Sequence, residues 1–125
     1  MSVELAGFLK KYENEDFEKS SKETPQKFAK FTAELKKAME SDLGLSSLEL
    51  ASFSKGHFHV TGFLEHAGKY VYFSVGDVRL DGQLHWRNVL YRTARDTSDF
   101  SGGQNHFCPL YELIENAEVL LDAVA

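Results

Sequence analysis

The stretch HFHVTGFLEHAGKYVYFSVGD, residues 57–77, decides the fold. Two runs with alternating side chains flank Ala67-Gly68, and this pattern predicts a β-hairpin with a tight turn. Pairing His66 with Lys69 gives one apolar face, made of Val60, Gly62, Leu64, Val71, Phe73 and Val75. The opposite face then carries Thr61, Phe63, Glu65, Tyr70, Tyr72 and Ser74. Because a slip of one residue would exchange the two faces, the pattern predicts this register alone.

Two amphipathic helices are predicted before the hairpin. Apolar residues recur at helical spacing over residues 3–12, and Ser2 is in the position of an N-cap. A second helical stripe covers residues 25–42, behind Thr24-Pro25, a pair that is typical of a helix start. Gly44 follows this stripe, where a helix is expected to stop.

Further strand and helix signals lie on either side of the hairpin. One strand is predicted near residues 48–53, and another over residues 86–93, after a turn at Asp81-Gly82. Pro109 is expected to open a last amphipathic helix, because apolar residues keep helical spacing from Leu110 to Val124.

These elements predict a single α+β domain over residues 1–125. We expect an antiparallel sheet of three to five strands, with two N-terminal helices and one C-terminal helix packed on one face. The other face of the sheet would then be wet, and therefore free for a ligand, a partner or a second copy of the chain.

The composition of the chain excludes some classes of partner and of cellular location. The net charge of −5, from 19 acidic and 14 basic residues, argues against nucleic acid as a partner. A single cysteine gives no disulfide framework, and no apolar run has the roughly 18 to 20 residues of a membrane-spanning helix. The sequence therefore predicts a cytoplasmic protein that is not embedded in a membrane.

His57 and His59 are two residues apart, so both imidazoles would leave the same face of a strand. Two such side chains are half of a zinc site, and nothing in the sequence shows that further ligands converge on them. We interpret them as half-exposed histidines, and predict neither a metal site nor a cofactor.

A polar loop is expected over residues 92–108, after the last predicted strand. It holds Arg92 and Arg95, the glycine pair Gly102-Gly103, and His106. In the favoured interpretation, Arg–Asp pairing ties the loop to the body of the protein, through residues such as Asp99. In the second interpretation the guanidinium groups bind a phosphate or a carboxylate, and the glycines let backbone amides approach it.

Cys108 also has two interpretations. If it directly precedes the last helix, the helix dipole would stabilise its thiolate, with His106 as a neighbouring base. A free cysteine is more often buried and structural, and Phe107 and Leu110 make the surroundings of Cys108 apolar.

The first functional hypothesis is a non-enzymatic binding or interaction module. Its wet sheet face would present Phe63, Tyr70, Tyr72 and His59, with Arg92 and Arg95 at the rim, and a protein partner or a homodimer would cover it. The alternative is a small-ligand protein or an enzyme for an anionic substrate. In that case Arg92 and Arg95 would hold the anion beside His106, with Cys108 as a candidate nucleophile.

Overall fold

The computed structural model describes residues 2–13, 25–55, 59–75, 88–99 and 104–123. Over these ranges the chain forms α1 (Val3–Lys11), α3 (Pro25–Leu43), β1 (Glu49–Lys55), β2 (Val60–His66), β3 (Lys69–Val75), β4 (Asn88–Ala94), β5 (His106–Pro109), the 3-10 helix η1 (Leu110–Glu112) and α4 (Leu113–Ala123). Both predicted N-terminal helices are confirmed.

The N-terminal helix α1 is held by a cap and by its packing on α3. The Ser2 hydroxyl accepts a hydrogen bond from the Leu5 backbone N–H at 3.1 Å, as expected of an N-cap. Near the other end of α1, Lys11 Nζ lies 2.8 Å from Glu34 Oε1, and the Tyr12 hydroxyl donates to the same carboxylate. These hydrogen bonds, first that of Lys11 and then that of Tyr12, hold the pKa of Glu34 below its usual value.

The sheet is antiparallel, in the order β1-β2-β3-β4-β5. Strands β2 and β3 pair from His66–Lys69 to Val60–Val75, so the predicted hairpin register is confirmed. Ala67 and Gly68 connect them with φ values of 53° and 78°, the left-handed backbone that a two-residue hairpin turn of type I′ requires.

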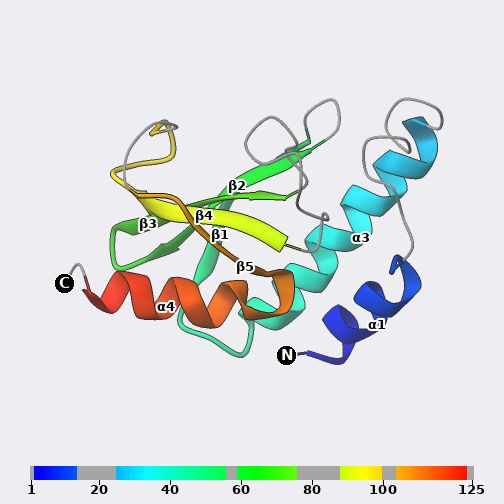
Figure 1. Ribbon diagram of the computed structural model, residues 1–125, viewed down its shortest axis with the longest axis horizontal. Coiled ribbons are helices and arrows are strands. Elements are labelled where there is room, and N and C mark those ends of the chain that lie inside the picture. The colour runs from blue at the N-terminus through cyan, green and yellow to red at the C-terminus, as the bar shows by residue number, and fades with distance from the viewer. Residues whose placement is uncertain (1, 14–24, 56–58, 76–87, 100–103, 124–125) are drawn as a thin grey trace.

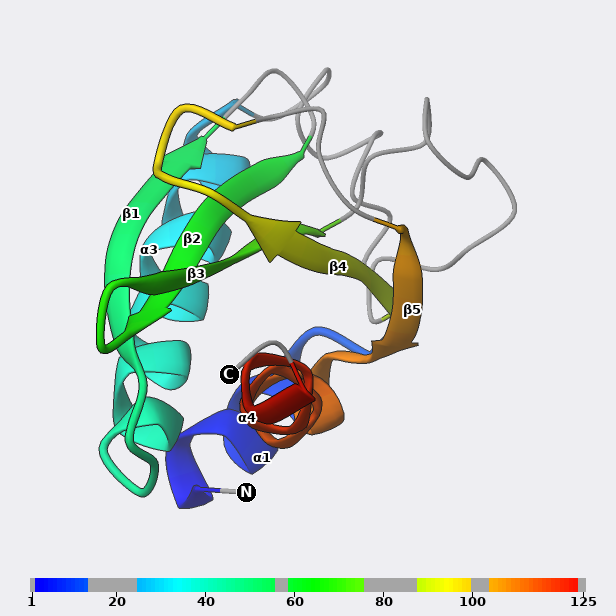
Figure 2. The same ribbon diagram turned by 90° about the vertical axis from the view of Figure 1, so that its left-hand side faces the viewer.

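All three α-helices cover one face of this sheet (Figures 1 and 2). One buried cluster unites the apolar side chains of that face with those of the helices. From the sheet it contains Val60, Leu64, Val71, Phe73, Val75, Val89 and Cys108. From the helices it contains Leu5, Phe8, Phe28, Phe31, Leu35, Ala38, Met39, Leu43, Leu113, Ile114, Ala117 and Leu121. The predicted α+β architecture is therefore confirmed.

The opposite face of the sheet is not wet at its centre, which corrects the sequence-based expectation. Phe63, Tyr72 and Leu90 form a second buried cluster there, and Tyr70 is packed against it. The expected exposure of Phe63 and Tyr72 is therefore wrong. The alternation of side chains along a strand sets which face a residue occupies, but whether that face is covered depends on segments elsewhere in the chain.

The C-terminal part differs from the prediction at Pro109. Residues 106–109, expected to be loop followed by a helix start, instead form β5 and pair with β4 from Tyr91–His106 to Asn88–Pro109. Pro109 ends this short strand in extended conformation, and η1 precedes α4. Proline is compatible with an edge strand because its missing N–H removes no hydrogen bond from a neighbouring strand there.

Several predicted features lie outside the described residues: the turn at Asp81-Gly82, the start of the strand at Trp86, His57, Thr24 and the Gly102-Gly103 pair. None of the helices in the described ranges combines the length and apolar character needed to cross a bilayer.

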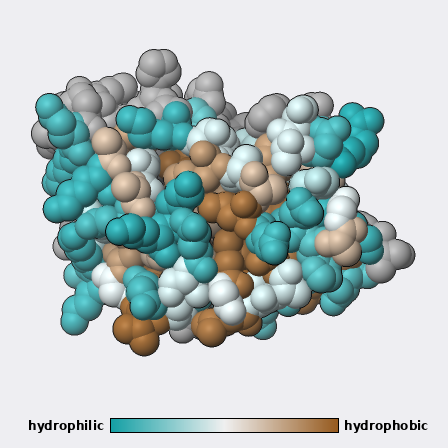
Figure 3. Space-filling view, turned by 180° about the vertical axis from the view of Figure 1, so that it is seen from behind, coloured by the Kyte–Doolittle hydropathy of each residue, from teal (hydrophilic) through white to brown (hydrophobic). Residues whose placement is uncertain are grey.

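The surface of the molecule seen from behind carries a small hydrophobic area, which hydrophilic residues surround and partly interrupt (Figure 3).

Candidate functional site

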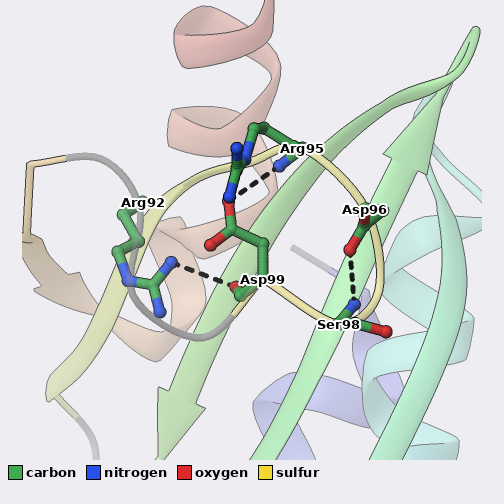
Figure 4. Close-up of polar contacts among 5 residues, drawn as sticks. All are labelled: Arg92, Arg95, Asp96, Ser98 and Asp99. Atoms are coloured by element: carbon green, nitrogen blue, oxygen red, sulfur yellow. Dashed lines mark hydrogen bonds and ion pairs between the residues drawn. The ribbon is translucent and has the colours of Figure 1, made fainter.

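The turn that follows β4, residues 95–99, is organised by two aspartates (Figure 4). Asp99 Oδ2 accepts hydrogen bonds from the Arg95 backbone N–H at 3.1 Å and from Arg95 Nε at 3.4 Å. Asp96 Oδ1 accepts one from the Ser98 backbone N–H at 2.8 Å. Short polar side chains that bond backbone groups a few residues away stabilise a turn locally. These hydrogen bonds stabilise the turn from within its own residues.

The Arg95–Asp99 pair can be compared with the expectation that Arg–Asp pairing ties the loop of residues 92–108 to the body of the protein. Arg95 and Asp99 form an Arg–Asp ion pair, but the two residues are four positions apart, so the pair closes the turn itself and does not tie it to another element. The Arg95 side chain is nevertheless 88% exposed, whereas the Asp99 side chain is almost fully buried. Because the pair is exposed on its cationic side, most of its structural value comes from the hydrogen bond to the Arg95 backbone.

Arg92 is the unusual member of the site. It is only 4% exposed, and its guanidinium carbon lies 4.3 Å from the centre of the Tyr72 ring. Nη1 donates to the backbone carbonyl oxygen of Asp99 at 3.3 Å (Figure 4). A guanidinium carries five N–H donors, and within the described residues this is its one hydrogen bond.

The charge of Arg92 is therefore buried without a carboxylate partner among the described residues. The Asp99 carboxylate is bonded to Arg95, and Asp99 offers Arg92 only its backbone oxygen. The π face of Tyr72 attracts the cation, but a cation–π contact is weaker than an ion pair at a buried position. The remaining donors of Arg92 favour an anion.

His106 does not join this site. Neighbouring residues of a strand point to opposite faces, and His106 pairs with Tyr91, the residue before Arg92. The two rings stack at 5.3 Å between centroids and 29° between planes, and Tyr91 packs against the core beneath the helices. Arg92 and His106 thus lie on opposite faces of the sheet, and the structure does not bring them together.

Cys108 is on the helix side of the sheet with His106. It is buried, and burial raises the pKa of its thiol above the ordinary value. A hydrogen bond with Asn116 opposes this shift in pKa, and the nearby carboxylate of Glu112 adds to it. The thiol form is therefore favoured at neutral pH, which is the opposite of what an activated nucleophile requires.

The other proposed binding residues are Tyr72, which belongs to the buried aromatic cluster, Tyr70 and His59. Tyr70 pairs with Ala94 at the end of β4, and both pack against that cluster. His59 directly precedes β2 and is half-buried. Within the described part of the chain, no three His, Cys, Asp or Glu side chains gather closely enough to hold a metal ion.

One residue with a potential role was missed in the sequence. Ser74 is 3% exposed, and its hydroxyl oxygen is buried without a hydrogen bond to any described residue. The hairpin register places Ser74 on the same face as Tyr72, so its location was predictable. Its burial was not, because the face was expected to be wet.

Comparison of the chain with protein-family models, with curated protein sequences and with solved structures found no match. The function proposed below therefore rests on the geometry of the site.

Proposed function

We propose that this protein is a non-enzymatic binding module that recognises an oxyanion through Arg92. The observation that carries the proposal is a guanidinium only 4% exposed, with one hydrogen bond to a backbone oxygen and no carboxylate partner among the described residues. Isolated buried charges are costly, and arginine is suited to planar oxyanions because its donors match their geometry.

The surroundings of Arg92 support binding without chemistry. The Tyr72 ring supports the guanidinium from one side, and the turn at residues 95–99 holds it from another. Pre-organised donors of this kind bind an anion at little cost in side-chain entropy. The opposite placement of His106 and the buried thiol of Cys108 speak against an acid–base pair or a nucleophile beside a bound anion.

Replacing Arg92 by methionine tests this proposal. Arg92→Met keeps an unbranched side chain over Tyr72 and removes the charge, so we expect anion binding to fall by roughly tenfold or more, since hydrogen bonds to a charged group are lost. Binding of acetate, benzoate and phosphate is measured by calorimetry and by amide chemical shifts, against chloride at equal ionic strength.

Arg95→Met is the matched control, because it removes a neighbouring guanidinium that is exposed and bonded to Asp99. It should leave affinity within about twofold, since exposed ion pairs contribute little. Arg92→Lys serves if the methionine variant does not fold: it keeps the charge but loses the planar donor set. Unchanged binding in the folded Arg92 variant, or loss in both Met variants alike, would contradict the proposal.

A second candidate function, self-association, is favoured by the free edge of the sheet. Within the described residues β5 is an edge strand, and its Phe107 is 45% exposed although it is paired with buried Leu90. An exposed apolar residue on an edge strand favours antiparallel pairing with a second copy about a two-fold axis.

Light scattering across a concentration series measures this association. We expect the mass of the chain to rise toward that of a dimer, and Phe107→Lys to restore the monomer, since a charge on an edge strand opposes pairing. Val119→Lys changes an exposed apolar residue of α4 in the same way and should leave the dimer intact. A monomer at every concentration would exclude self-association.

A further inference from the structure

We propose that Ser74 is the second donor of the Arg92 site, and that the ligand is a small monocarboxylate with an apolar body. This inference rests on the proposed function, because it assigns a partner residue and a ligand class to the same site. Its starting point is the buried Ser74 hydroxyl, which has no hydrogen-bond partner among the described residues.

The strand register brings the two groups together. Tyr72 pairs with Arg92, and Ser74 pairs with Leu90, so Ser74 and Arg92 are diagonal neighbours on adjacent strands and on the same face. Diagonal positions in an antiparallel pair lie roughly 7 to 8 Å apart, within reach of a long side chain. A single bound oxyanion between them can therefore accept hydrogen bonds from both.

Because they are buried, the Ser74 hydroxyl and the Arg92 guanidinium would both be stabilised by a hydrogen-bond acceptor. A buried hydroxyl without a hydrogen bond destabilises the folded protein, and so does a buried cation without a counter-ion. Ser74 is 3% exposed and Arg92 is 4% exposed. One oxyanion between them would satisfy both groups at once.

The single positive charge of Arg92 favours a ligand with a single negative charge. Asp99 gives its backbone oxygen to Arg92 and its carboxylate to Arg95, so the Arg92 guanidinium forms no ion pair among the described residues. A carboxylate neutralises this charge, whereas a phosphate group at neutral pH carries an excess of negative charge that would itself be buried.

The neighbouring side chains select the body of the ligand. Phe63, Tyr72 and Leu90 form the apolar cluster on this face, and Arg92 lies over one of its rings. Apolar surroundings of this kind favour an aromatic or aliphatic group next to the carboxylate. Because both donors are more than nine-tenths buried, a ligand that lies between them has to be small, and the surface of a folded protein does not fit there.

The experiment compares benzoate, acetate and phosphate on the complete chain and on Ser74→Ala. We expect benzoate to bind more tightly than acetate or phosphate, and Ser74→Ala to weaken benzoate binding by roughly fivefold to tenfold through the lost hydrogen bond. The melting temperature of the free Ser74→Ala protein should stay the same or rise, because a buried unpaired hydroxyl is removed. Ser54→Ala, at an exposed serine of β1 that pairs with Thr61, is the matched control and should change neither quantity.

The outcomes distinguish the proposed anion binding by Arg92 from the proposed role of Ser74. If Ser74→Ala binds benzoate as the unchanged protein does while Arg92→Met does not, the role of Ser74 is wrong and the Arg92 site stands. If phosphate binds as tightly as benzoate, the ligand class is wrong. A lower melting temperature of Ser74→Ala with unchanged binding would indicate a purely structural hydroxyl, and binding that survives in Arg92→Met would overturn both proposals.

Discussion

Replacement of Gly62 by alanine should lower the free energy of unfolding by about 3 kcal/mol, the upper part of the range for overpacked cores. Gly62 lies in β2 on the helix side, between Phe53 on β1 and Phe73 on β3. A Cβ atom there would overlap the backbone oxygen of Ser52 and would lie 2.6 Å from Cζ of Phe73.

Neither neighbour has room to yield. The Ser52 oxygen belongs to the backbone of β1, beside the irregularity in the β1–β2 pairing between Leu50 and Ser52. The Phe73 ring is fully buried in the main core, and close-packed interiors transmit such displacements to their neighbours. Gly62 is thus required by the close approach of β1 and the Phe73 ring.

Gly7→Ala is the matched control, because the same methyl group enters open space in the middle of α1. It should raise stability by about 0.5 to 1 kcal/mol, since alanine favours a helix over glycine. Urea unfolding followed by circular dichroism measures both variants. Equal stability changes of the same sign would contradict the steric explanation.

Phe31→Ala should have the largest effect of any single truncation that we propose, with a loss of about 3 to 5 kcal/mol in the free energy of unfolding. Phe31 is fully buried on α3, and its contacts with other described rings include Phe8, Tyr12 and Phe28, with centroid distances of 5.2 Å, 4.8 Å and 6.4 Å. Its removal takes away the aromatic packing of α3 against Phe8 and Tyr12, while the polar contacts of Lys11 and Tyr12 with Glu34 stay in place.

Hydrogen exchange adds a regional measurement to this prediction. Because Phe8 and Tyr12 belong to α1 and its C-cap and lose their common partner, amides of α1 should lose more protection than those of β2 and β3. Tyr111→Ala removes a half-exposed aromatic residue in η1 and should change stability by less than about 0.5 kcal/mol. A uniform loss of protection across the chain would show that α1 is not a separate unit.

The candidate site was only partly predictable. The grouping of Arg92, Arg95 and Asp99 in one polar stretch was visible in the sequence, and a salt bridge between Arg95 and Asp99 followed from it. The difference between an exposed Arg95 and a buried Arg92 was not visible. That difference depends on the strand to which Arg92 belongs and on the Tyr72 ring of the neighbouring strand.

Residues 106–109 are a part of the fold that could not be predicted from the sequence. Their four residues contain His106, Cys108 and Pro109, and no periodic pattern is long enough in them to indicate a strand. They become β5 because residues 88–91 of β4 offer a free edge for backbone hydrogen bonds. Because this strand forms by pairing with β4, residues 106–109 carry no signal of it in their own sequence.

By itself, the sequence determined the features that depend on neighbours along the chain. The alternation of residues 60–75 set the hairpin register, Ala67-Gly68 set its turn, and helical spacing set α1 and α3. Only the tertiary structure decided that the second face of the sheet is buried at its centre, that Arg92 is buried while Arg95 is exposed, and that the Ser74 hydroxyl has no hydrogen bond to the described residues. Burial is a property of what packs on top of a residue, and a local pattern does not contain that information.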